Sequence, residues 1–123
     1  MGHGRRRRCG DAGSTMSAPL RVVRVWRGLV APTSVDVYLG HFDREVTPAL
    51  LATSGFLGAG ILCREVDAGL ELVVTTVWES LDPIRAFAGE DVLRAVVHPD
   101  AHAALLQFDE RVTHYEVIQA VNR

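Results

Sequence analysis

The chain of 123 residues contains no lysine, so all 13 of its basic residues are arginine. Chemistry that forms a Schiff base on a lysine amine is therefore excluded. Cysteine is scarce: Cys9 and Cys63 form no CxxC pair or other ligand pattern, which predicts a reduced, cytoplasmic protein. No apolar run approaches the roughly 18 to 20 residues that span a bilayer, so the sequence also predicts no membrane contact.

Charge is distributed unevenly along the chain. Arg5 to Arg8 supply four of the 13 basic residues, whereas the part from Met16 onward carries 9 Arg against 14 acidic residues. This acidic body predicts that the fold itself does not bind nucleic acid. Residues 1–18 lack apolar periodicity and are predicted to form a flexible, Arg-rich leader, followed by a single domain of residues 19–123.

The leader admits other interpretations. Met16 could be the natural start, which would make the leader an artefact, and the arginine run could be a nucleic-acid-binding arm or part of a twin-Arg export signal. An export signal needs an apolar segment after the arginines, and CGDAGSTMSAP is not one. An artefact or a disordered tail is the favoured interpretation.

The first half of the domain predicts a strand followed by a helix. Residues 20–30, LRVVRVWRGLV, are rich in β-branched and aromatic side chains. Pro32, Thr33 and Ser34 then offer a helix start, and Pro48 is expected to bend or end that helix. After this start, apolar residues recur at spacings of three and four, as on one face of a helix: Val35, Leu39, Phe42, Val46 and Leu50.

The second half predicts a hairpin, short helices and a closing strand. Residues 55–66 and 70–80 read as strands joined through the turn at residues 67–69. Helical pieces follow, broken near Gly89 and Pro99, and residues 111–121 are predicted as the last strand. The order βαββαβ predicts an α+β, ferredoxin-like sandwich with a four-stranded antiparallel sheet and helices on one face.

Both faces of the first strand are apolar, which predicts a dimer. Val23, Val25 and Leu29 alternate with a second set on the other face: Val22, Trp26 and Val30. Two helices cover only one face of such a sheet. A second sheet from an identical subunit is the simplest cover for the other, so the sequence predicts a homodimer.

Several segments together resemble a known family. These are VRVWRG, the strand ending VWES, IRAFAGED followed by AVVHPD, and the closing FDERVTHYEV. Across Leu20 to Val121 the chain resembles the antibiotic biosynthesis monooxygenase superfamily of dimeric α+β barrels. The resemblance implies a cofactor-independent monooxygenase that uses molecular oxygen on a small aromatic or polyketide-like molecule. A cyclase or isomerase in the same cavity, and a non-catalytic ligand-binding or structural dimer, are the alternatives.

Haem degradation, another activity of this superfamily, is predicted to be absent. The resemblance places the three residues that this branch needs, an Asn, a Trp and a ligating His, near Trp26, Phe87 and Val97. None of the three matches. His98 is one residue away, but one residue turns a helical side chain by about 100°. Haem is therefore not predicted as a cofactor, and neither is any other group.

The resemblance implies a cavity between sheet and helices with aromatic walls, an oxyanion partner and a base. His114 is the candidate base, and it shares a strand face with Glu116; a purely structural His–Glu pair is the alternative. Arg24 is the candidate oxyanion partner, and it is expected either to reach an edge or to pair with Glu116 or another acid. The candidate aromatic walls are Trp26, Trp78, Phe87 and Phe42.

The remaining histidines and glycines are expected to have structural roles only. His98 and His102 have the spacing of a helical metal pair, but Pro99 places His98 at a helix start, so a capping or surface role and no metal are predicted. His41 is expected to form a solvated pair with Glu45 at i,i+4. The GFLGAG segment enters a strand rather than a helix, so its glycines predict bending or close approach and not phosphate binding.

Overall fold

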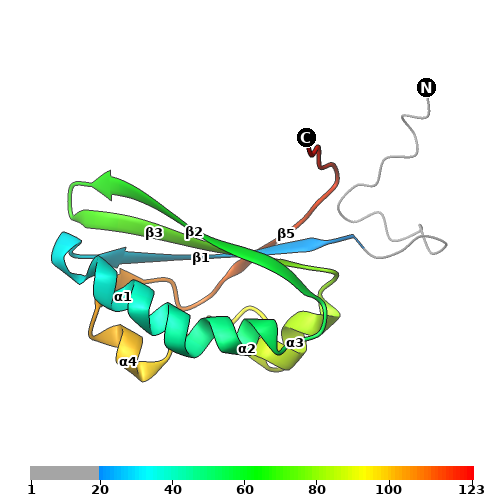
Figure 1. Ribbon diagram of the computed structural model, residues 1–123, viewed down its shortest axis with the longest axis horizontal. Coiled ribbons are helices and arrows are strands. Elements are labelled where there is room, and N and C mark those ends of the chain that lie inside the picture. The colour runs from blue at the N-terminus through cyan, green and yellow to red at the C-terminus, as the bar shows by residue number, and fades with distance from the viewer. Residues whose placement is uncertain (1–19) are drawn as a thin grey trace.

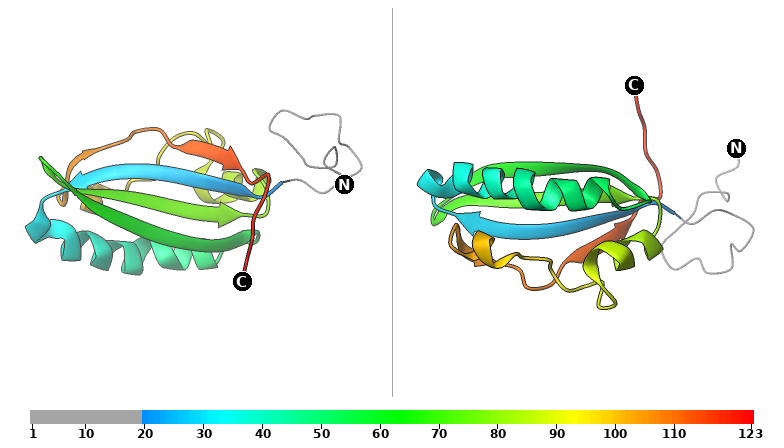
Figure 2. Two further views of the ribbon diagram at one scale, coloured as in Figure 1. Left: turned by 90° about the horizontal axis from the view of Figure 1, so that it is seen from above. Right: turned by 60° about the horizontal axis from the view of Figure 1, so that its bottom comes forward.

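The structure, a computed structural model, describes residues 20–123 (Figure 1). The predicted leader, with Arg5 to Arg8, Cys9 and Met16, lies outside these residues. One antiparallel sheet carries all of the described helical segments on one of its faces (Figure 2). The predicted α+β architecture is thereby confirmed. None of the helices in residues 20–123 has the length and hydrophobicity needed to cross a membrane.

The sheet is built around its first strand. β1 (Val22–Val30) pairs on one side with β3 (Gly69–Trp78), which in turn pairs with β2 (Phe56–Val66). The predicted hairpin between β2 and β3 is confirmed. On its other side β1 pairs with two short strands, β4 (Leu105–Phe108) and β5 (Thr113–Glu116), which share the fourth position of the sheet.

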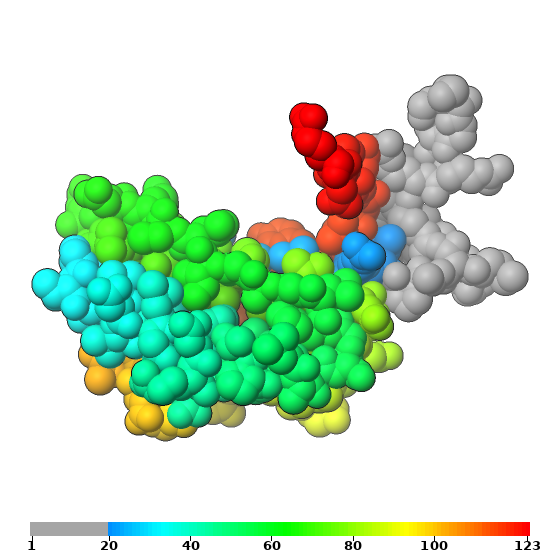
Figure 3. Space-filling model, in the orientation of Figure 1, coloured from blue at the N-terminus to red at the C-terminus, as the bar shows by residue number. Residues whose placement is uncertain are grey.

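The last strand differs from the prediction of residues 111–121. Between β4 and β5 the chain leaves β1 and pairs with the preceding loop instead: Val112 N donates to Leu93 O and Ala95 N donates to Glu110 O, at 2.7 and 2.9 Å. β5 ends at Glu116 because β1 begins at Val22, so later residues have no strand beside them in the described chain. Residues 117–123 project from the body on the sheet side opposite the helices (Figures 1 and 3).

The first helical segment is continuous but not uniform. A 3₁₀ turn at Pro32–Ser34 starts it, followed by α1 (Val35–His41), a π-helical turn η3 (Phe42–Val46) and α2 (Thr47–Leu51). The π turn stands directly before Pro48, which lacks an N–H and whose ring crowds the carbonyl four residues earlier. The predicted bend at this proline therefore takes the form of a widened turn.

The widened turn changes which side chains face the sheet. Tyr38, His41, Phe42 and Leu50 are buried, whereas Leu39, which the helical spacing places on the inner face, is 36% exposed. The other helices, α3 (Asp82–Ala88) and α4 (Pro99–His102), are short and separated by a loop, as the breaks at Gly89 and Pro99 predict. The core between helices and sheet contains fully buried side chains from several elements: Val30, Leu50, Leu72, Trp78 and Ile84.

Gly28 on β1 makes room for Trp26. The two residues lie on the same face of the strand, and a Cβ atom at Gly28 would lie 2.6 Å from the Cη2 atom of the Trp26 indole. The indole is held in place because its Nε1 donates to Asp109 O at 2.8 Å and its ring stacks on Tyr38 at 6.0 Å between centroids. Glycine at position 28 is thus a packing requirement.

We expect Gly28→Ala to lower the free energy of unfolding by about 1–3 kcal/mol, because the Trp26 indole must move to admit the methyl group. Gly58→Ala, on β2, is the matched control, since a Cβ there meets no atom within 4 Å. The control is expected to leave stability unchanged or to raise it slightly, because glycine weakens strand interiors. Urea unfolding of the two variants checks this, and equal stabilities would contradict the packing argument.

Candidate functional site

A cavity lies between the helix-facing side of the sheet and the helices. β1 forms its floor, the α1–α2 run lies along one side, and α4 with the loop before it lies along the other (Figure 2). Its volume is about 60 Å³, room for about two water molecules. The lining residues are mostly aromatic or aliphatic: Arg24, Trp26, Tyr38, His41, Phe42, Val46, Val74, Thr76, Phe87, Val96, Val97, His98, Ala101 and Val112.

Arg24 brings a charge into this apolar site. The residue is 5% exposed, and its guanidinium donates to the carbonyl oxygens of Val92 and Arg94, the latter at 2.9 Å. A third hydrogen bond, from Nη1, reaches Nε2 of His114 at 3.1 Å. These contacts hold the loop before α4 against β1, so Arg24 both closes the site and places a cation in it.

Arg24 has no carboxylate partner in residues 20–123, and all three of its acceptors are neutral. The expectation that it reaches an edge or pairs with Glu116 or another acid is therefore wrong. Glu116 is exposed at the end of β5, and the loop carbonyls take the guanidinium N–H groups instead. Burial lowers the pKa of Arg24 to about 10, so the side chain keeps its charge at neutral pH.

His114 supports Arg24 from β5 and does not line the cavity. The two residues are directly opposite each other in the β1–β5 register. Because an arginine only donates, Nε2 of His114 accepts, and its proton in the neutral ring is on Nδ1. Burial, and secondarily the charge of Arg24, lower the pKa of His114 below its usual value of 6.5, so the neutral form is favoured.

The aromatic residues predicted as walls separate into two groups. Trp26, Phe42 and Phe87 line the cavity. Trp78 does not: it is fully buried, its Nε1 donates to the Thr76 hydroxyl at 2.8 Å, and its ring packs edge-on against Phe56. Trp78 is a core residue, and it supports the cavity from behind through two lining residues, Thr76 and Phe87, the ring of Phe87 lying 5.6 Å away.

Three cavity residues were missed or misjudged from the sequence. His41 is 4% exposed, so its predicted solvated pairing with Glu45 is wrong. His98 caps α4 as predicted, with Nδ1 accepting from Asp100 N at 3.2 Å, but it also lines the cavity. Tyr38 was not identified; burial raises its pKa to about 12, so it remains a protonated phenol.

The polar side chains that line the cavity are neutral or positively charged, and none of them is acidic. The lining includes an arginine, two histidines, a tyrosine and a threonine, and no aspartate or glutamate. The described part of the chain contains no group of three or more His, Cys, Asp or Glu that could hold a metal ion. An apolar pocket with a buried cation and hydrogen-bond donors is complementary to an anionic or easily ionised aromatic ligand.

Comparison with known proteins relates the fold to solved structures. No family model matches the sequence, and no curated protein matches it. A protein from Bacillus cereus assigned as an antibiotic biosynthesis monooxygenase superposes with a TM-score of 0.61 at 17% identity, covering 85% of this chain and 97% of that one. SnoaB, a cofactor-independent oxygenase from Streptomyces nogalater, gives 0.54 at 24% identity, covering 85% and 99%.

A monooxygenase from the gene ActVA-Orf6 of Streptomyces coelicolor, solved in complex with Nanaomycin D, gives a TM-score of 0.57 at 17% identity, covering 85% of this chain and 93% of that one. A heme-degrading protein from Mycobacterium tuberculosis shares the fold as well, with a TM-score of 0.55 at 21% identity and coverage of 85% and 99%. Since one fold carries different chemistries, similarity at this level establishes architecture alone. The resemblance seen in the sequence is confirmed at that level: this chain has the ferredoxin-like fold of the antibiotic biosynthesis monooxygenases.

Proposed function

We propose that this protein is a cofactor-independent monooxygenase that binds a small, ionisable aromatic molecule of polyketide type in the cavity over β1. One observation carries the proposal: Arg24 is a buried cation with only neutral partners in an aromatic-walled cavity that has no carboxylate. Buried charges are normally paired, and a ligand oxyanion would supply the missing partner. The oxygenase and monooxygenase activities of structural neighbours support the choice of reaction.

The proposed reaction needs only groups that this cavity contains. A phenolic or enolic ligand loses a proton, and its electron-rich carbanion form reduces molecular oxygen. For an anthrone, one oxygen atom enters the ring carbon as a carbonyl, and the other leaves as water with the two hydrogens of that carbon. Trp26, Phe42 and Phe87 exclude water from the ring, and Arg24 stabilises the oxyanion.

His114 then acts through Arg24. The sequence predicts His114 as the base, but the Nε2 lone pair that a base would use already accepts from Arg24. Held neutral, His114 positions the guanidinium without competing for the ligand's negative charge. Glu116 is exposed and has no part in this arrangement.

Ligand entry requires the walls to separate. The cavity of about 60 Å³ is far below the roughly 300 Å³ at the lower end of small-molecule sites. Phe87 belongs to a short helix, and Val96 and Val97 to the irregular loop that Arg24 holds by its carbonyls. We propose that this side of the cavity moves outward to admit a ring.

Arg24→Gln is expected to weaken binding of an ionised hydroxyanthrone by about 10- to 100-fold, the effect of losing one hydrogen bond to a charged group. Binding of the corresponding methyl ether, which cannot ionise, should change by less than about threefold. Arg64→Gln is the control, because Arg64 pairs with Glu71 on the surface. Calorimetric titration checks the affinities, and oxygen uptake checks turnover. Equal losses for both ligands would contradict an oxyanion role, and binding without oxygen uptake would favour an isomerase or cyclase.

The pKa of His114 provides a second test of this arrangement. We expect its ring to titrate below pH 6.5 in the native protein and Arg24→Gln to raise that pKa, since a positive neighbour is removed. As the pH drops, the unfolded chain therefore binds this proton at a higher pH than the native protein does. The free energy of unfolding falls as the pH drops from 6.5 through the native pKa of His114. NMR titration of the imidazole signals gives the value. A pKa above 6.5 in the wild-type protein would contradict the arrangement.

We propose further that the uncovered sheet face pairs two subunits. Its residues alternate with those facing the helices and are largely apolar over one half of the sheet: Val23, Val25, Leu62, Val73, Val77 and Tyr115. Charged residues occupy the other half, where Arg64 pairs with Glu71 at 2.7 Å. A largely apolar sheet face of this kind is typical of a protein interface.

Leu62→Arg is expected to convert the dimer to a monomer, because it places a charge in the proposed interface. Leu62 is 58% exposed in the single chain. Leu51→Arg is the matched control: Leu51 is 72% exposed but lies at the end of α2, on the helical side. Light scattering coupled to size exclusion gives the masses. A monomeric wild-type protein, or dimeric Leu62→Arg, would contradict this interface.

A further inference from the structure

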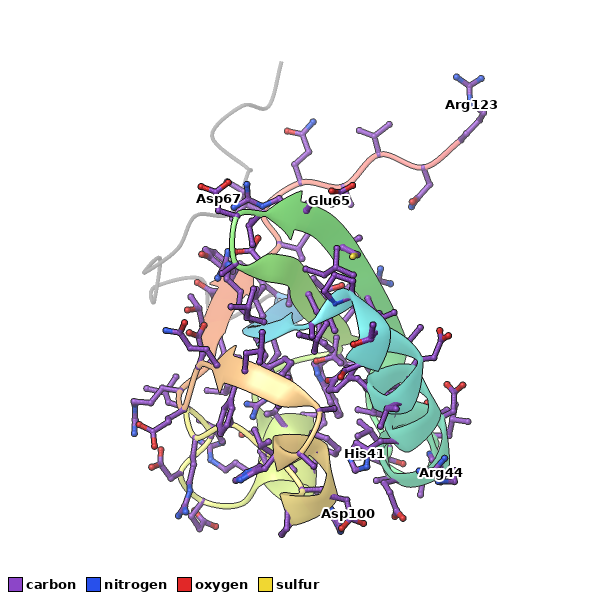
Figure 4. The ribbon with its side chains drawn as sticks, turned by 90° about the vertical axis from the view of Figure 1, so that its left-hand side faces the viewer. His41, Arg44, Glu65, Asp67, Asp100 and Arg123 are labelled. Atoms are coloured by element: carbon purple, nitrogen blue, oxygen red, sulfur yellow. The ribbon has the colours of Figure 1, made fainter. Side chains whose placement is uncertain are left out.

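His41 contains a polar atom that the fold does not satisfy. The residue ends α1, is 4% exposed and lines the cavity. Its Nδ1 is the one buried side-chain nitrogen or oxygen without a hydrogen-bond partner in residues 20–123. Buried polar groups nearly always have partners, and a native exception needs an explanation. Figure 4 shows His41 between the α1–α2 run and α4, where Asp100 is labelled.

The spacing of α1 and the π turn after it place the side chains around this ring. Thr47 N donates to Phe42 O, five residues back, as in a π turn. The wider turn brings residues i and i+5 to the same side, so His41 and Val46 face the cavity together with Phe42. His41 itself follows Tyr38 by three residues in α1, so ordinary helical spacing already places both on the inner face. The fold thus directs a histidine inward and leaves its nitrogen without a partner.

The other polar groups of the cavity are unsuited to accept a proton. Arg24 only donates, and the pKa of Tyr38, raised to about 12 by burial, keeps its phenol protonated. Nδ1 of His98 accepts from Asp100 N at 3.2 Å, and its side chain is 46% exposed. The Thr76 hydroxyl accepts from Trp78. Two aromatic rings neighbour His41: the ring centroids of Tyr38 and His98 lie 6.4 and 5.4 Å from that of His41.

The geometry points to His41 as the catalytic base of the cavity, which takes the phenolic or enolic proton of the ligand while Arg24 stabilises the resulting oxyanion. This role rests on the proposed function, and it makes His41 the base in place of His114. The ligand O–H bond breaks, its electron pair stays on oxygen, and an N–H bond forms at Nδ1 of the Nε2–H tautomer. After the reaction with oxygen, this proton joins the departing hydroxide as water. Nδ1 becomes reachable when the walls separate, as a ring-sized ligand requires.

A chromophoric phenol tests the step without turnover. The probe is a hydroxyanthraquinone, which cannot be oxidised in this reaction and whose phenolate absorbs at longer wavelength than the phenol. At a pH one unit below the pKa of the free probe, we expect the wild-type protein to bind it as the phenolate. His41→Asn keeps a hydrogen-bonding group near the Nδ1 position but cannot accept a proton. It should bind the probe within about threefold of the wild-type affinity and lower the bound phenolate-to-phenol ratio at least about tenfold, one pKa unit.

His102→Gln is the control, because His102 is exposed, packs against Phe108 and does not line the cavity. It should behave as the wild type. With an oxidisable anthrone, His41→Asn is expected to lower kcat by about 10²- to 10⁴-fold, the usual contribution of a general base. An unchanged phenolate ratio in His41→Asn would overturn the role of His41 and leave the proposed cavity function standing. Neutral probe bound to the wild type would overturn both, because Arg24 would then stabilise no oxyanion. Failure of the wild type to bind any probe would overturn both. Circular dichroism establishes that each variant is folded.

Discussion

The guanidinium of Arg24 is the charge around which the site is organised. It is buried on the central strand, where an unpaired cation is costly, and its partners are the carbonyls of Val92 and Arg94 and the ring of His114. These contacts fix the loop that closes one side of the cavity. Because every partner is neutral, the positive charge is not cancelled. The same interactions that hold the fold together here therefore leave an uncompensated positive charge at the cavity.

A second constraint arises from the covalent structure of one residue. Pro48 cannot donate to the turn before it, and the helix widens into the π turn of Phe42–Val46. The widened turn brings Val46 to the side of His41, whose Nδ1 is left without a partner. A local restriction on the backbone thus helps to shape the cavity wall beside this ring. Strain and unsatisfied groups of this kind tend to lie at functional sites.

The two faces of the sheet contribute to different parts of the protein. Alternation along β1 sends Arg24 and Trp26 toward the helices and Val23 and Val25 toward the uncovered side. The first pair belongs to the cavity, and the second belongs to the proposed subunit interface. The fold is shared with oxygenases and with a heme-degrading protein at 17–24% identity. Because one fold carries different chemistries, the function of this chain depends on the polar groups of its own cavity.

The sequence by itself determined the architecture, because strand and helix periodicities are local and the turn residues at 67–69, Gly89 and Pro99 mark where elements end. It also identified Arg24, Trp26, Phe42 and Phe87, since residues two apart on a strand share a face and large aromatics fill the space above it. Only the tertiary structure decided where the histidines lie. Whether His114 faces Arg24 or the cavity depends on pairing between residues 90 positions apart, and His41 is packed against His98 from a distant segment. Contacts between distant segments leave no periodic trace in the sequence, and in this protein they decide which polar groups meet at the cavity.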